Sequence, residues 1–391
     1  MKPEMINFFD RYLDDRYTRR LLSDMIRIPS VVGSEQTLAE FILKELQEMG
    51  IESRLDEVEP GRSNVYARLS GSRPGKRLHF TGHMDTVPVC EGWIMDPFAA
   101  TVQGDKMIGL GSCDMKAGLA CAMNMLRAIK LSGIDFAGEL LFSAVVDEEA
   151  YSKGTLKLAG TDFGQCDAVV IAEPFPADEQ HPTPIGITGK VLYDITVKGK
   201  AAHGFLPHEG INAVEEAARI LTALDRLNLR THPEYGKGNY STLKIEGGYQ
   251  IYTVVVPDVC RVEINRLLVP GETSQSALQD MRDLVASLNL SADVDVTLKA
   301  PVYESYVLNN DEPILQVLNE IYPLVMGGKI PHYGFSHVIT DANVFAGKLH
   351  IPTIHLGPPM GNIHQRDEYV LLSWLAPVSK MYALIAERFL S

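Results

Sequence analysis

The feature that most constrains this chain is a seven-residue apolar run, Leu140–Val146, which contains no charged residue, glycine or proline. Such a run is apolar on both faces and has the length of a strand, although a buried helical segment could look similar. Three further short apolar segments alternate with a helical pattern at residues 115–131, and they lie at 64–68, 78–82 and 168–172. This alternation predicts an α/β domain with a largely parallel central sheet flanked by helices.

The pattern changes near residue 184, where alternating strands replace continuous apolar runs. The order of strands and helical patterns resembles a ferredoxin-like β-α-β-β-α-β unit. The strands are expected at Val191–Lys198, Ser241–Glu246 and Arg261–Val269, and the helices at 211–227 and 274–288. The α/β pattern returns from about residue 300. We therefore predict one domain built from residues 1–183 and 299–391, and a second, inserted domain at 184–298.

Charge and cysteine usage exclude several classes of protein. The chain carries 36 Lys and Arg against 50 Asp and Glu, a net charge of −14, and no basic patch, so general nucleic-acid binding is not expected. The five cysteines are odd in number and form no CxxC pair, which does not fit a disulfide framework. The chain has no apolar run of about 18 residues and no secretory signal pattern. We expect a cytoplasmic protein without a membrane partner.

Chemically active side chains gather where the predicted strands end. His83 and Asp85 follow one strand, three acids at 147–149 follow the Leu140–Val146 run, and Glu173 follows a third strand. Asp114 stands just before the helical pattern, and His364 lies far downstream. Taken singly, these residues have ordinary explanations. His83 could lie in a surface turn, Asp114 could cap a helix, the acids could be solvated, and His364 could be a common surface histidine.

Together, these residues point to a metal site. The carboxyl ends of strands in an open α/β sheet converge on one edge, where ligands bind. Histidine and carboxylate ligands without cysteine suit Zn(II), Mn(II) or Co(II). Five candidate ligands are too many for one catalytic zinc, but they fit two metals that share a carboxylate.

Six segments in the same order along the chain resemble the M20 metallopeptidases, the family of acetylornithine deacetylase, succinyl-diaminopimelate desuccinylase and carboxypeptidase G2. They span nearly the whole chain, so the match is specific. The segments are GHMDTVP at 82–88, GLGSCDMKAG at 109–118, DEE at 147–149, AEP at 172–174, GKAAHGFLPHEGINA at 199–213 and NIHQRDEYV at 362–370.

The resemblance implies a role for each matching residue. Asp114 would bridge two divalent ions, most simply Zn(II), with Co(II) or Mn(II) as alternatives. His83 and Glu173 would complete one site, and Glu149 and His364 the other. Glu148 would be the general base, and Asp85 would hold His83. The inserted domain would serve as lid and homodimer interface, with His203 reaching the partner's active site and Arg266 binding a substrate carboxylate.

The resemblance also implies the reaction: hydrolysis of the amide bond of an N-acyl amino acid or small peptide, as in acetylornithine deacetylase. Three segments depart from the family pattern, at Thr253–Pro257, Ile264–Arg266 and Gly357–Pro359. They leave the acyl group and the amino acid open. Two alternatives remain: a non-catalytic metal-binding relative and a dinuclear phosphoesterase. The sequence contains no phosphate-binding glycine-rich loop that would favour the phosphoesterase.

Overall fold

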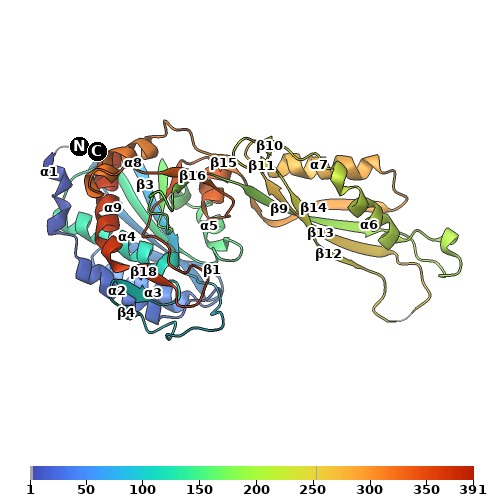
Figure 1. The fold of residues 1–391 in the computed structure, drawn as a ribbon, viewed down its shortest axis with the longest axis horizontal. Helices are drawn as coiled ribbons and strands as arrows, with labels where there is room; N and C mark the ends of the chain where they lie inside the picture. Colours follow the sequence, from blue (N-terminus) through green and yellow to red (C-terminus); the bar gives the residue numbers. More distant parts are fainter. Residues whose placement is uncertain (1–2, 252) are drawn as a thin grey trace. The chain divides into compact units, whose positions relative to one another are not determined.

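The computed structural model describes residues 3–251 and 253–391, which form two compact units (Figure 1). Among the described residues, the first unit contains 3–185, 308–334 and 340–391, and the second contains 186–251, 253–307 and 335–339. The main segment of the second unit therefore runs from Gly186 to Val307 rather than from residue 184 to 298. It is extended because β14 (Asp293–Tyr303) continues through the predicted boundary and β15 (Tyr306–Val307) pairs with residues 186 and 187 of β8 (Thr183–Ile187).

A six-stranded sheet forms the centre of the first unit. Its order is β1 (Glu52–Glu59), β2 (Arg62–Ser70), β6 (Ala137–Val145), β3 (Arg73–His83), β7 (Ala168–Ile171) and β17 (Thr353–His355). Strands β6, β3, β7 and β17 are parallel, whereas β1 and β2 are antiparallel to their neighbours. Because β1 and β6 are both antiparallel to β2, five of the six strands run in one direction, and the sheet is largely parallel with β2 as its antiparallel strand. The polar sequence of β1 gave no apolar run by which to predict it.

Helices pack around this sheet and place the loops at its edge. Helices α4 (Ala117–Ser132) and α9 (Leu375–Leu390) pack together and both contact β3, while α3 (Gln36–Glu48) contacts β1 and β2. Helix α4 begins very close to the end of β7, since any side chain at Gly118 would collide with the carbonyl oxygen of Ala172. The remaining helices and strands of this unit are α1 (Pro3–Ile6), α2 (Asp15–Arg27), α5 (Lys153–Leu158), α8 (Pro313–Val325), β4 (Thr101–Gln103), β5 (Lys106–Ile108) and β18 (Tyr369–Leu371).

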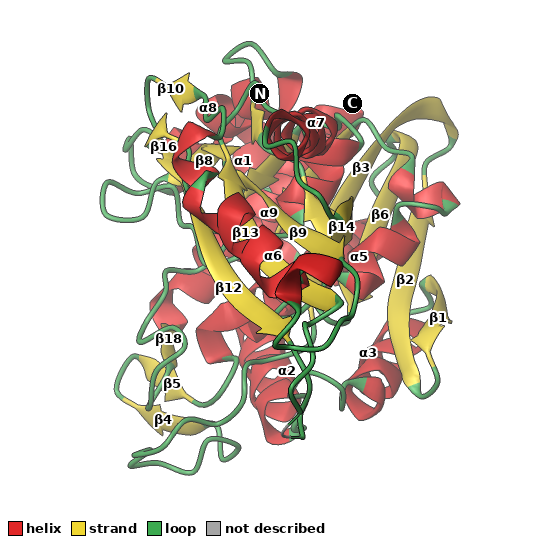
Figure 2. Cartoon of the chain, turned by 90° about the vertical axis from the view of Figure 1, so that its right-hand side faces the viewer, coloured by secondary structure: helices red, strands yellow, loops and turns green. Residues whose placement is uncertain are grey.

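The second unit has two helices on one face of a four-stranded antiparallel sheet (Figure 2). Along the chain its main elements are β9 (Gly189–Lys198), α6 (Ala213–Thr222), β12 (Tyr240–Gly247), β13 (Val259–Leu268), α7 (Ser274–Ser287) and β14. In space the strand order is β12-β13-β9-β14. Every second residue of β9, from Val191 to Val197, is buried against α6 and α7, as the two-residue period of a strand requires. The remaining short strands are β10 (Thr231–His232), β11 (Gly236–Lys237) and β16 (Tyr333–Ser336).

Strand β12 lies at an edge of this sheet and has exposed side chains on both faces. Leu243 and Ile245 are among these exposed side chains.

All five cysteines are free thiols. None of the helices in residues 3–251 and 253–391 has the length and apolar character needed to cross a membrane.

Candidate metal centre

Three parallel strands bring their carboxyl ends to one place in the first unit. In the sheet, β3 lies between β6 and β7, with His83 opposite Val145 and Thr81 opposite Ile171. His83 is the last residue of β3, and the acids at 147–149 begin two residues after β6. Glu173 stands two residues after β7. The strand register alone therefore gathers a histidine and several carboxylates at the sheet edge, as the sequence predicts.

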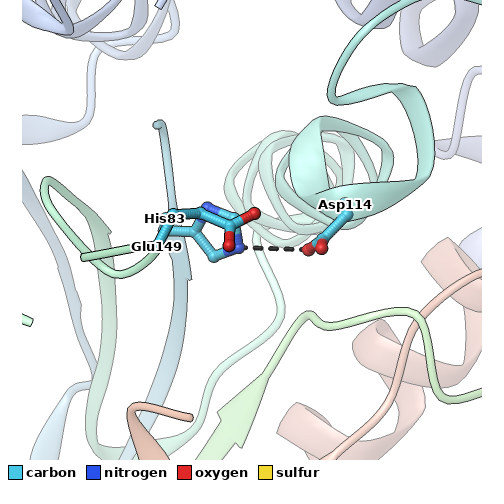
Figure 3. A group of neighbouring side chains, drawn as sticks. All are labelled: His83, Asp114 and Glu149. Atoms are coloured by element: carbon cyan, nitrogen blue, oxygen red, sulfur yellow. Dashed lines mark hydrogen bonds and ion pairs between the residues drawn. The ribbon is translucent and has the colours of Figure 1, made fainter. Parts of the chain in front are cut away.

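Asp114 lies between two histidines. Its Oδ1 is 3.1 Å from Nε2 of His83, and its Oδ2 is 3.1 Å from Nε2 of His364. The residue lies in a short irregular turn before α4, where its own backbone is non-helical with φ of −117° and ψ of 92°, and it is 6% exposed. Figure 3 shows its carboxylate facing the His83 ring from the start of α4. The two oxygens of one carboxylate thus face two different imidazoles.

The remaining predicted carboxylates surround the same histidines. Oε1 of Glu149 is 3.0 Å from Nε2 of His364, and Oε1 of Glu173 is 3.6 Å from Nε2 of His83. Ligand atoms of His83, Glu148 and Glu173 all lie within 4.8 Å of one another, as do those of His83, Asp114 and Glu149. These two groups share His83, so proximity alone does not divide the side chains into two ion sites.

Asp85 holds His83 in a different way from the one expected. Nδ1 of His83 is 2.8 Å from the backbone carbonyl oxygen of Asp85, whereas the nearest carboxylate oxygen is 3.9 Å away. The Asp85 carboxylate instead accepts a hydrogen bond of 2.9 Å from the backbone N–H of Glu149. Asp85 therefore connects His83 to the turn that carries Glu149, and it leaves Nε2 of His83 facing the site.

Negative charge accumulates in this buried cluster. Burial raises the pKa of Glu148 well above its ordinary value, and the nearby charges of Glu173, Asp341 and Glu149 raise it further against the opposing effect of His83. Burial and the charge of Asp114 likewise raise the pKa of Glu173. Burial would raise the pKa of Asp114 too, but hydrogen bonds from His364 and His83 lower it below the ordinary range. The same contacts with Asp114 and Glu149 raise the pKa of His364 to about 10.

The two remaining predicted residues lie in the second unit. His203 is exposed on a loop, where its Nδ1 accepts a hydrogen bond from the backbone N–H of Phe205. Arg266 is fully buried, and its guanidinium pairs with Glu272 at 2.6 Å and Asp280 at 3.0 Å. It also donates to the Tyr193 hydroxyl. The prediction that Arg266 binds a substrate carboxylate is therefore wrong for this structure, because two carboxylates of its own unit already occupy the guanidinium.

Comparison with known proteins identifies the family. Residues 79–388 match the model of peptidase family M20/M25/M40. This chain belongs to that family.

Named relatives and solved structures agree with this M20 assignment over nearly the full chain. A succinyl-diaminopimelate desuccinylase of Phenylobacterium zucineum is 28% identical over 383 residues, covering 94% of this chain and 97% of the relative. An acetylornithine deacetylase of Aliivibrio fischeri is 29% identical over 343 residues, covering 85% of each. The structure of the Bacillus subtilis protein YXEP, described as a dinuclear metal binding peptidase of the M20 family, has a TM-score of 0.69 and 18% identity, and covers 98% of both chains.

The M20 chain also contains a buried ion network that the sequence reasoning missed. Arg62 contacts Glu35 at 2.5 Å and Asp147 at 2.8 Å, and both carboxylates are almost fully buried. Asp147 directly precedes Glu148 and has a left-handed backbone, with φ of 71°. Arg62 therefore fixes the turn that carries Glu148 and Glu149. The signal in the sequence was the acid at 147, which has no role in the family pattern but directly precedes the predicted base Glu148 and the predicted ligand Glu149.

We expect the Arg62 network to contribute strongly to stability. Arg62→Met would leave two buried carboxylates without their cation, which typically costs about 3–5 kcal/mol. Arg54→Met is the matched control, since Arg54 pairs with Asp162 on the surface, where an ion pair contributes about 0–1 kcal/mol. Denaturant unfolding of the metal-free proteins measures both. Equal unfolding midpoints for the two variants would contradict a stabilising role for the buried network.

Proposed function

We propose that this chain is a two-metal amide hydrolase that cleaves N-acyl amino acids or small peptides. The observation that carries the proposal is the position of Asp114, whose two carboxylate oxygens each face a different histidine at 3.1 Å. A carboxylate that binds a single ion needs a histidine beside only one of its oxygens. Two partners on opposite oxygens support a ligand shared by two ions, the arrangement common to dinuclear hydrolases.

The donor set suits divalent cations. Four carboxylates and two imidazoles share the cluster, and among the ion pairs of residues 3–251 and 253–391 none joins these carboxylates to lysine or arginine. Oxygen and imidazole nitrogen are ligands for Zn(II), Co(II) and Mn(II). We assign His83 and Glu173 to one ion and Glu149 and His364 to the other, with Asp114 shared. Zn(II) is the ion we favour.

Glu148 is the remaining acid in the cluster and is our candidate for the general base. When bound, the two ions would polarise the scissile carbonyl and lower the pKa of a water molecule between them. Glu148 would accept the proton of the attacking water and pass it to the leaving amine. Its neighbours support this role, because burial and the nearby carboxylates raise the affinity of its carboxylate for a proton.

The substrate class follows from the relatives rather than from a side chain of this structure. The relatives at 28% and 29% identity are named for removing succinyl and acetyl groups from amino acids. We therefore propose an N-acyl amino acid as substrate, with acetylornithine-like deacetylation as the nearest case. Since Arg266 is occupied by Glu272 and Asp280, the group that recognises a substrate carboxylate has to be another one.

We further propose that the second unit is the lid and homodimer interface. The unpaired edge of β12 and its exposed Leu243 and Ile245 support pairing with a second copy. The exposed position of His203 is compatible with action on the partner's active site. A reducing, cytoplasmic location stays a prediction, with five free cysteines in its support.

Metal analysis tests the shared ligand. We expect the wild type purified with added zinc to hold about two equivalents per chain. Asp114→Ala should weaken both ions together, because it removes both carboxylate oxygens of the shared residue. Inductively coupled plasma mass spectrometry after gel filtration measures the content. Loss of a single ion, with the other held at its normal affinity, would argue against a bridge.

Replacing each of the two neighbouring glutamates by glutamine tests their separate roles. Glu148→Gln should retain both ions and lower kcat about 10²–10⁴-fold, the usual contribution of general base catalysis. Glu149→Gln should instead lose metal affinity. Activity and metal content are measured on the same preparations. If the two variants behaved alike, the division between base and ligand would be wrong.

A substrate panel tests the reaction class. We expect kcat/KM to be highest for an N-acetyl or N-succinyl amino acid, with dipeptides next, and no turnover of a phosphodiester. The assays use zinc-, cobalt- and manganese-loaded protein, with Glu148→Gln as the control for contaminating activity. Phosphodiester cleavage that depends on Glu148 would replace the proposed reaction with a phosphoesterase activity. Full metal binding without turnover of any amide would favour a non-catalytic relative.

A further inference from the structure

The Glu368 side chain accepts three hydrogen bonds from the loop that carries Asp114. Its Oε2 accepts a hydrogen bond of 2.8 Å from the backbone N–H of Gly111. Its Oε1 accepts two more, from the N–H groups of Cys113 at 2.9 Å and Asp114 at 3.1 Å. Glu368 is 2% exposed, so its side chain takes the place of water as the partner of these three amides. Neither the predicted ligand set nor the predicted base includes Glu368.

The same residue also connects Asp114 to the loop of His364. Glu368 lies four residues after His364 and immediately before β18, and its backbone carbonyl accepts from the N–H of Gly109 at 2.9 Å. Strand β18 then pairs with β5, with Tyr369 opposite Ile108. On the other side of His364, the N–H of Gly361 lies 3.4 Å from Sγ of Cys113. Contacts on both sides of His364 therefore fasten its loop to residues 106–114.

Only a carboxylate of this length meets these demands. All three partners are N–H donors, so both side-chain oxygens must accept. A glutamine would present one oxygen and one NH₂ group, and the NH₂ would face a donor. An aspartate keeps both acceptors but is one methylene shorter, so it would not reach all three amides without movement of the backbone.

We propose that Glu368 is the positioning residue that holds Asp114 between the two ion sites, a role that rests on the proposed dinuclear function. By fixing the Asp114 backbone through its own N–H and that of Cys113, Glu368 sets the direction of the Asp114 carboxylate. Because Glu368 lies on the same segment as His364, it also keeps the His364 imidazole beside the second oxygen of Asp114. Glu368 touches neither the reacting atoms nor the ions in this arrangement.

The test compares Glu368→Gln, Glu368→Asp and the wild type in competition titrations with a zinc chelator. Residues that orient metal ligands typically contribute 10–100-fold to metal affinity. We expect Glu368→Gln to weaken the binding of both ions by that factor, and Glu368→Asp to weaken it less. The absorption spectrum of the cobalt-loaded protein should change with Glu368→Gln, because the ligand geometry around both ions depends on Asp114.

Hydrogen exchange gives a second readout that does not depend on metal. The N–H groups of Gly111, Cys113 and Asp114 should exchange slowly in the metal-free wild type and faster in the Glu368 variants. Segment 260–268 of the second unit should be unchanged. If Glu368→Gln fails to fold, Glu368→Asp supplies both measurements.

Glu304→Gln is the matched control for general destabilisation. Its carboxylate also accepts from a backbone N–H, that of Ser274, but it lies in the second unit. We expect it to lower the melting temperature without changing metal affinity or the cobalt spectrum. Normal affinity and a normal spectrum in Glu368→Gln would overturn the proposal, as would an equal loss of metal in Glu304→Gln at equal destabilisation. If the wild type bound one ion, the dinuclear function would fail, and the affinities for that ion would still decide the role of Glu368.

Discussion

Repulsion between closely spaced carboxylates that are largely shielded from water is the constraint on which the candidate metal centre depends. Four acids, Asp114, Glu148, Glu149 and Glu173, converge where three strands end, and the imidazoles of His83 and His364 lie among them. Like charges in a site shielded from water disfavour the ionised state. That cost raises the pKa of Glu148 and Glu173 and favours occupation by divalent cations.

Structure outside the cluster holds the repelling groups together. Arg62 binds Asp147 and thereby fixes the turn of two of the acids. Glu368 holds the backbone of Asp114. The Asp85 carbonyl orients His83, while its carboxylate receives the N–H of Glu149. Each support lies on a different segment of the chain. The candidate ligands are thus placed by tertiary contacts between loops, and the parallel strands supply only their approximate position.

The sequence predicted those parts of the molecule whose signals are local. Strands β3, β6 and β7 contain apolar runs, and the side chains that follow them were identifiable from strand ends and family motifs. Strand β1 was missed because its residues are polar, and the second unit extends past its predicted end. Arg266 was assigned wrongly because its partners Glu272 and Asp280 come together only in the folded unit. Arg62 was missed for the same reason, since its partner Asp147 lies 85 residues away.

The bridging position of Asp114 is the central claim, and anomalous scattering from crystals of the zinc-loaded protein tests it most directly. We expect two peaks about 3.5–4 Å apart, the spacing of paired metal sites in hydrolases, with one Asp114 oxygen bound to each. A single peak, or two peaks of which Asp114 contacts only one, would contradict the account.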